Sequence, residues 1–86
     1  MTKEDFFEKH GTFQMRTAKQ INGIPYGDEA LYIMVGGLVG KQEITEILIS
    51  NDGRGISDFY HRASVWSGDQ LISEHPVHNL ECVFYA

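Results

Sequence analysis

The sequence contains a single cysteine, Cys82, among its 86 residues, so an internal disulfide is excluded. Small domains built for oxidising compartments usually carry several cysteines. The chain starts with acidic residues and no apolar segment follows them, which is not the pattern of a secretory signal. An Asn-x-Ser/Thr acceptor for N-glycosylation is also absent. We therefore expect a cytoplasmic protein.

Long hydrophobic runs are missing as well. The longest run covers residues 30–35 and ends at Gly36 and Gly37, whereas a membrane span needs roughly 18 consecutive apolar residues. The sequence therefore predicts no membrane partner.

Positive charge is scarce. Seven Lys and Arg residues face twelve Asp and Glu residues, which gives a net charge of −5 and a pI near 5.2. Such a chain repels phosphate polymers, so nucleic acid is disfavoured as a partner. The excess of acids lies mainly in residues 41–86, where it would complement a basic surface on another protein. The acids form no long block, which argues against mimicry of nucleic acid.

What the sequence does contain is enough apolar material for one core. Hydrophobic residues make up 42% of the chain, which is typical of a globular protein rather than a disordered one. No internal repeat or linker divides the chain. A single domain over residues 1–86 follows.

Local patterns predict one short helix and several extended segments. Thr2 and Asp5 have the spacing of a capping box, which predicts a helix over residues 3–9. Alternating or β-branched stretches predict strands. They cover residues 12–21, 30–35, 43–49, 58–66 and 80–85, with a shorter extended piece at 70–73.

Turn signals separate these segments. Asn22-Gly23 predicts a type I′ turn, and Pro25 limits the pairing that follows it. Further turns are expected around Gly53 and Gly68. Pro76 is expected to break any ladder that reaches it.

Residues 30–35 allow two interpretations. An unbroken apolar run of this length is typical of a central strand buried on both faces. Ala, Leu and Met also favour helix, and Asp28 and Glu29 would suit a helix start. We favour the strand because Gly36, Gly37 and Gly40 cut the run too short for a stable helix.

The predicted fold is therefore α+β: a mostly antiparallel, twisted sheet of four to five strands with one short N-terminal helix. A small β-barrel is the alternative if the sheet closes. The absence of crossover helices excludes a parallel doubly wound fold.

Two groups of residues invite a comparison with known chemistry and do not meet its requirements. Gly36 to Lys41 resembles a phosphate-binding loop, but the glycine spacing is one residue short and Gln42 replaces the hydroxyl that binds magnesium. Ser57, Asp58 and His61 are the residue types of a nucleophilic triad, but neighbours on one strand rarely present that geometry. We expect no cofactor and favour a non-enzymatic role.

The densest set of possible metal ligands is His75, His78 and Cys82. Imidazole and thiolate suit zinc, but the spacing matches no zinc motif and Pro76 lies between the histidines. Cys82 alternates with Leu80 and Phe84, which predicts that the three share a buried face. We therefore predict no metal site.

The surplus of aromatic residues suggests a protein-binding surface. A domain this small cannot bury ten aromatic side chains, and large aromatic residues are frequent at interface hot spots. We predict a small interaction module, an inhibitor or adaptor, that binds another protein through an aromatic and acidic face or an exposed strand edge. An unpaired edge would also favour a homodimer. The predicted binding residues are Tyr32, Tyr60, Arg62, Trp66, Glu43 and Glu46.

The alternative is a small-ligand-binding or enzymatic domain with a pocket over residues 60–66. Arg62 beside Tyr60 and Trp66 would hold an anionic or nucleotide-like ligand through charge and stacking. A second basic residue on the same face would favour this interpretation.

Overall fold

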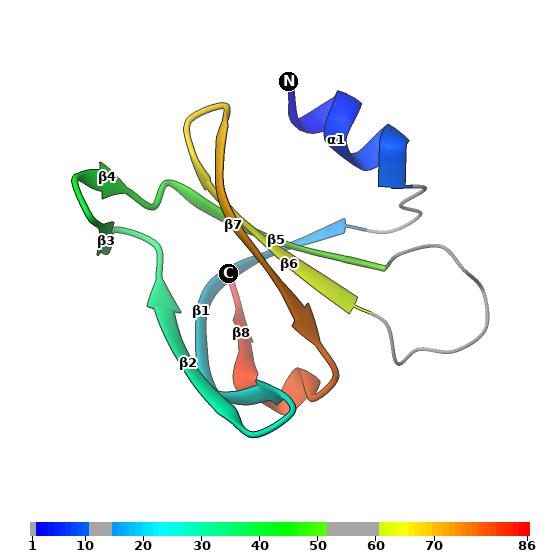
Figure 1. Ribbon diagram of the computed structural model, residues 1–86, viewed down its shortest axis with the longest axis vertical. Coiled ribbons are helices and arrows are strands. Elements are labelled where there is room, and N and C mark those ends of the chain that lie inside the picture. Colours follow the sequence, from blue (N-terminus) through cyan, green and yellow to red (C-terminus); the bar gives the residue numbers. More distant parts are fainter. Residues whose placement is uncertain (1, 11–14, 52–60) are drawn as a thin grey trace.

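The computed structural model describes residues 2–10, 15–51 and 61–86 (Figure 1). In these residues a helix is followed by short strands and one 3₁₀ turn. The elements are α1 (Lys3–His10), β1 (Met15–Tyr26), β2 (Glu29–Met34), β3 (Leu38–Val39), β4 (Gln42–Glu43), β5 (Glu46–Asn51), β6 (His61–Ser67), β7 (Gln70–Val77), η1 (Leu80–Cys82) and β8 (Val83–Tyr85). No helix in this part of the chain is long and apolar enough to cross a membrane.

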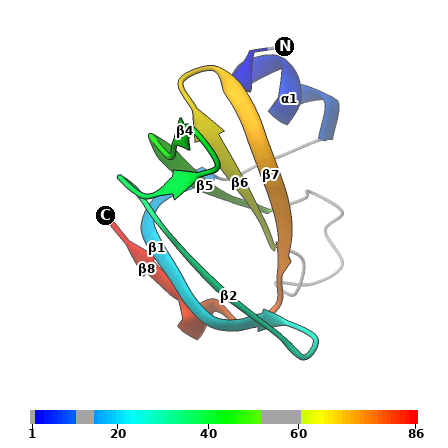
Figure 2. The same cartoon turned by 60° about the vertical axis from the view of Figure 1, so that its left-hand side comes forward.

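The main sheet is antiparallel and curls into a half-barrel (Figure 2). Its strand order is β2-β1-β5-β6-β7, and β8 also pairs with β1, while β3 and β4 form a separate hairpin. The long strand β1 makes the curl possible because its first residues pair with β5 and its last residues with β2. The N–H groups of His78 and Asn79 donate to the carbonyl of Pro25 at 2.6 and 2.9 Å, which ties the end of β7 to β1. The predicted fold class, α+β with a mostly antiparallel sheet, is confirmed.

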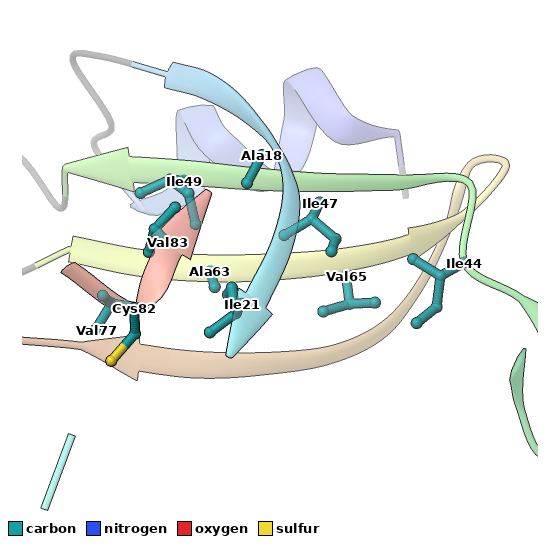
Figure 3. Packing of buried hydrophobic residues seen from close by; sticks show 10 residues of the cluster. All are labelled: Ala18, Ile21, Ile44, Ile47, Ile49, Ala63, Val65, Val77, Cys82 and Val83. Atoms are coloured by element: carbon teal, nitrogen blue, oxygen red, sulfur yellow. The ribbon is translucent and has the colours of Figure 1, made fainter. Parts of the chain in front are cut away.

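The inner face of the half-barrel carries the main core. Small and β-branched side chains from β1, β5, β6, β7, η1 and β8, together with Ile44 between β4 and β5, meet there (Figure 3). Strands of alternating polarity bury one face in this way, since successive side chains point to opposite sides. The buried members are Ala18, Ile21, Ile44, Ile47, Ile49, Ala63, Val65, Val77, Cys82 and Val83.

Helix α1 covers the outer face of β5 and β6. Phe6 packs against Leu48 and Trp66 in a second, smaller cluster. The rings of Phe6 and Trp66 meet edge to face, with centroids 5.5 Å apart. The N–H of Asp5 donates to the Thr2 hydroxyl at 3.1 Å, as the capping pattern predicts.

The strand predictions are confirmed in type, with shifted bounds. β5 begins later than the expected 43–49, because the short β4 takes up the start of that segment. The turn at Gly68 is confirmed between β6 and β7. The expected extensions over residues 12–14 and 58–60, and the turn near Gly53, lie outside the described residues.

The prediction of a turn at Asn22-Gly23 is wrong. Both residues lie inside β1, and the chain reverses at Gly27 and Asp28 instead. Gly23 has φ +139°, and a Cβ atom there would lie 2.7 Å from the Sγ atom of Cys82. The glycine is therefore required for a close approach to the C-terminal segment and for the irregular register that follows it, not for a turn.

The prediction that residues 30–35 form a strand is confirmed. The prediction that this strand is central and buried on both faces is wrong. β2 is the first strand of the sheet, and its side chains alternate between half-buried and exposed. The apolar run is therefore an edge strand with one uncovered face.

Pro76 does not break the ladder, contrary to expectation. It lies inside β7 and pairs with Arg62 of β6. An edge strand tolerates proline when the missing N–H would have faced away from the neighbouring strand, and β7 is the last strand of the sheet.

The C-terminal strand is shorter than predicted. Residues 80–82 form η1, and only β8 is extended. The 3₁₀ turn changes which side chains face inward: Cys82 and Val83 are buried, whereas Leu80 and Phe84 are exposed. The core position of Cys82 is confirmed, but the common face with Leu80 and Phe84 is wrong.

Candidate functional site

A group of exposed apolar side chains lies at the end of β2 and on the following hairpin. Leu38 is 71% exposed and Tyr32 is 63% exposed, although both are large hydrophobic side chains. We call this surface the edge patch. Its exposed members are Tyr32, Met34, Val35, Leu38 and Val39.

The edge patch surrounds a pocket of about 300 Å³. Ile33 and Ile44 line it together with members of the patch. The N–H of Gly36 donates to the carbonyl of Ile44 at 2.8 Å, and the N–H of Ile44 donates to Gly37 at 2.9 Å. These bonds fix the β3–β4 hairpin beside β2, so the pocket is held by backbone contacts.

One backbone edge of β2 has no neighbour among the described strands, because β2 pairs only with β1. Free edges usually carry lysine, proline or a bulge that prevents pairing with another chain. Residues 30–40 contain none of these charges and no proline. The edge of β2 is therefore able to accept another strand.

Charged residues flank this uncharged stretch, with Glu29 before it and Lys41 and Glu43 after it. Glu29 begins β2, and Glu43 lies opposite Leu38 in the β3–β4 hairpin. Both side chains are exposed. The edge patch is therefore apolar and is flanked by two acidic residues and one basic residue, Lys41.

The apolar surface continues across the outer face of the sheet. Met34, Gln20 and Phe84 lie directly opposite one another on β2, β1 and β8. Opposite residues in an antiparallel pair share a face. Phe84 is exposed, so it extends the surface beyond the edge patch.

The structure brings only part of the predicted binding set together. Tyr32 and Glu43 both lie beside the hairpin that forms the edge patch. Trp66 is 1% exposed beneath α1, and Glu46 forms an ion pair with Lys3 there. These two side chains hold the helix in place.

Among the described residues 61–66, the side chains that were expected to line one pocket lie apart. Arg62 lies 3.3 Å from Glu74 in an ion pair (Nε to Oε1) on the outer face, whereas His61 lies opposite Val77 on the inner face. Trp66 is buried, and Tyr60 lies outside the described residues.

The three weak metal candidates serve other contacts. His75 lies 3.0 Å from the Ser73 hydroxyl, and burial lowers the pKa of its imidazole against the opposing effect of Glu74. The ring of His78 stacks on Tyr26 with centroids 6.1 Å apart. Cys82 contributes to the core. Within the described ranges, no three His, Cys, Asp or Glu side chains gather as metal ligands would.

Two features of the structure escaped sequence reasoning. The pocket of the edge patch depends on the β3–β4 hairpin, which was not among the predicted elements. Arg16 lies opposite Ile49 on the inner face, although strict alternation from the buried Ile21 would place it on the outer face. The register shift between Ala18 and Gln20 reverses the alternation, because Lys19 adds one residue to β1 opposite β8.

Comparison with protein-family models, curated proteins and solved structures finds no match for this chain.

Proposed function

We propose that this protein is a non-enzymatic interaction module that binds an extended segment of another protein along the free edge of β2. The observation that carries the proposal is the edge patch: an edge strand without charge after Glu29, beside an apolar pocket of about 300 Å³. Strand addition of this kind draws affinity from backbone hydrogen bonds and specificity from side-chain pockets. A module that binds without chemistry acts as an adaptor or as an inhibitor of its partner.

The chemistry of the edge patch specifies the partner. Tyr32 and Leu38 favour a segment with large apolar side chains at alternate positions, since alternate residues of a strand point to one face. Glu29 and Glu43 outnumber Lys41 around the edge patch and favour basic residues at the ends of that segment. The net charge of −5 supports the same choice.

Selection from a library of displayed random peptides on the immobilised full chain tests this proposal. Enriched peptides are expected to alternate large apolar residues and to carry Lys or Arg near their ends. Leu38→Lys is expected to weaken binding of an enriched peptide by at least about tenfold, since a buried leucine contributes about 2 kcal/mol. Isothermal titration calorimetry measures the affinity.

Met15→Lys is the matched control. Met15 is also an exposed apolar residue, and it begins β1, at the end of that strand that does not pair with β2. The substitution adds the same charge as Leu38→Lys. The proposal fails if no peptide is enriched, or if both variants weaken binding equally.

Sedimentation of the chain alone distinguishes a second copy from a different partner. β2 edges of two copies would pair antiparallel about a twofold axis. Self-association that Leu38→Lys abolishes would assign the edge patch to a homodimer and would overturn the proposal of a different partner.

A further inference from the structure

A second pocket, separate from the edge patch, lies where β5 ends and β6 begins. It has a volume of about 130 Å³, and we call it the mouth pocket. Its lining residues come from β1, β5, β6, η1 and β8. They are Arg16, Ile49, Asn51, His61, Leu80 and Tyr85.

The register shows that polar side chains occupy inward positions in this pocket. Arg16 lies opposite Ile49, and His61 lies opposite both Asn51 and Val77. Ile49 and Val77 belong to the buried core, and opposite residues share a face. Polar groups that converge on an apolar concavity at the mouth of a barrel are typical of a small-molecule site.

Arg16 is held in a geometry that suits an anion. Its Cζ atom lies 3.7 Å from the centroid of the Tyr85 ring, so the guanidinium stacks on the ring by its face. Stacking leaves the N–H donors at the edge of the guanidinium available for a bidentate contact. No carboxylate of the described residues forms an ion pair with Arg16.

His61 supplies an independent observation. Its Nδ1 atom is buried and has no hydrogen-bond partner among the described residues. A buried polar atom without a partner costs about 1–3 kcal/mol, and such atoms in folded proteins call for an explanation. An oxygen acceptor bound beside His61 would satisfy this nitrogen when Nδ1 carries the proton.

We propose that the mouth pocket binds a carboxylate group with a short apolar substituent. Arg16 binds the carboxylate through its paired donors, and His61 donates a further hydrogen bond through Nδ1. Ile49 and Leu80 contact the apolar substituent. A volume of about 130 Å³ is close to that of a four- or five-atom acid such as propionate, at about 30 Å³ for each water-sized group.

Phosphate fits this site less well than a carboxylate. Every oxygen of a phosphate seeks a polar partner or water, and the apolar walls formed by Ile49 and Leu80 offer none. The carboxylate has two sources, a free small acid or the C-terminus of a peptide, and the titrations below separate them.

Titration of the ¹⁵N-labelled full chain followed by NMR tests this proposal. Propionate is expected to cause saturable shifts at Arg16 and His61 in the millimolar range, with sodium chloride at matched ionic strength as reference. Binding is also expected to move His61 toward the tautomer with its proton on Nδ1. Inorganic phosphate should bind at least about tenfold more weakly.

Titration with acetyl-glycyl-alanine tests whether the bound carboxylate is the C-terminus of a peptide. Weaker binding than that of propionate supports a free small acid as the ligand. Equal or tighter binding supports the C-terminus of a peptide. Both outcomes support a carboxylate as the group that the mouth pocket binds.

Arg16→Gln is expected to abolish the saturable chemical-shift changes that propionate causes. Arg62→Gln is the matched control, because it removes the same charge from the outer face. Melting curves establish that both variants fold. A second test variant is Tyr85→Leu, which removes the ring that stacks on Arg16 and keeps the charge of Arg16. This variant is expected to weaken the binding of propionate. Linear shifts without saturation, equal effects of the Arg16 and Arg62 variants, or tighter binding of phosphate would overturn the proposal.

Discussion

At the scale of single residues, Gly23 determines how β1 passes the C-terminal segment. Its φ of +139° is a conformation that side chains with a Cβ atom rarely adopt. The nearest heavy atom to an added Cβ would be the Sγ atom of Cys82 at 2.7 Å. Cys82 is itself buried in the core, so it has little space in which to move. Backbone strain and a steric clash therefore act together at this position.

Gly23→Ala is expected to destabilise the protein by about 2–4 kcal/mol in urea denaturation, through strain and overpacking. Gly27→Ala is the control, because Gly27 also has a positive φ of +66° but has no atom near its added Cβ. That variant should lose only about 1 kcal/mol.

Cys82→Ala in the Gly23→Ala background should recover part of the loss, because it removes the clashing sulfur. Equal destabilisation by Gly23→Ala and Gly27→Ala would show that the close approach to Cys82 contributes nothing.

At the scale of elements, α1 depends on the sheet beneath it. Eight residues are too few for a helix to be stable alone in water. Phe6 anchors it against Trp66, and Lys3 lies with Nζ 5.7 Å from the Trp66 ring centroid while pairing with Glu46. The side chain of Trp66 is oriented in turn by a 2.8 Å hydrogen bond from Nε1 to the Ser64 hydroxyl. The helix and the outer face therefore stabilise each other.

Phe6→Ala is expected to reduce the free energy of unfolding by about 3 kcal/mol and to shift the fluorescence of Trp66 to longer wavelength. Trp66 is the one tryptophan of the sequence, so the signal is specific to this contact. Far-UV circular dichroism on the same sample establishes that the sheet remains folded.

Glu8→Ala is the control, since Glu8 is exposed on the same helix. An unchanged emission maximum in the Phe6 variant would contradict the packing of α1 on Trp66.

At the scale of the whole molecule, the described part of the half-barrel has interior strands and edge strands. β1, β5 and β6 each have more than one neighbouring strand, whereas β2, β7 and β8 each pair with a single strand. Local opening requires fewer broken contacts at an edge than in the centre. The proposed partner surface therefore lies on an element of low local stability.

Hydrogen exchange is expected to reflect this order. Backbone amides of β5 and β6 should exchange most slowly, and amides on the free edge of β2 should exchange fastest among the sheet residues. A peptide selected as described above should slow the exchange of β2 and leave β6 unchanged. Amides of β2 that exchange as slowly as those of β6 in the free chain would show that something already covers this edge.

Local patterns in the sequence were sufficient for the helix, the strand character of most segments and the burial of Cys82. Of the residues predicted to bind a partner, Tyr32 and Glu43 lie beside the β3–β4 hairpin. Trp66 and Glu46 were predicted for the same surface, and the structure places them against α1. The reason is that polarity and size decide whether a residue prefers to be buried, but not which element covers it.

The sequence by itself therefore determined the elements, because capping, alternation and turn residues act over a few neighbouring positions. Tertiary structure alone decided that residues 30–35 form an edge, that Gly23 faces Cys82 and that Arg16 lies on the same side of β1 as the core. Each of these depends on pairing between distant segments, and one extra residue at Lys19 reverses the inner and outer faces of β1. The two proposed sites lie where that long-range pairing places the edge of β2 and the pocket between Arg16 and His61.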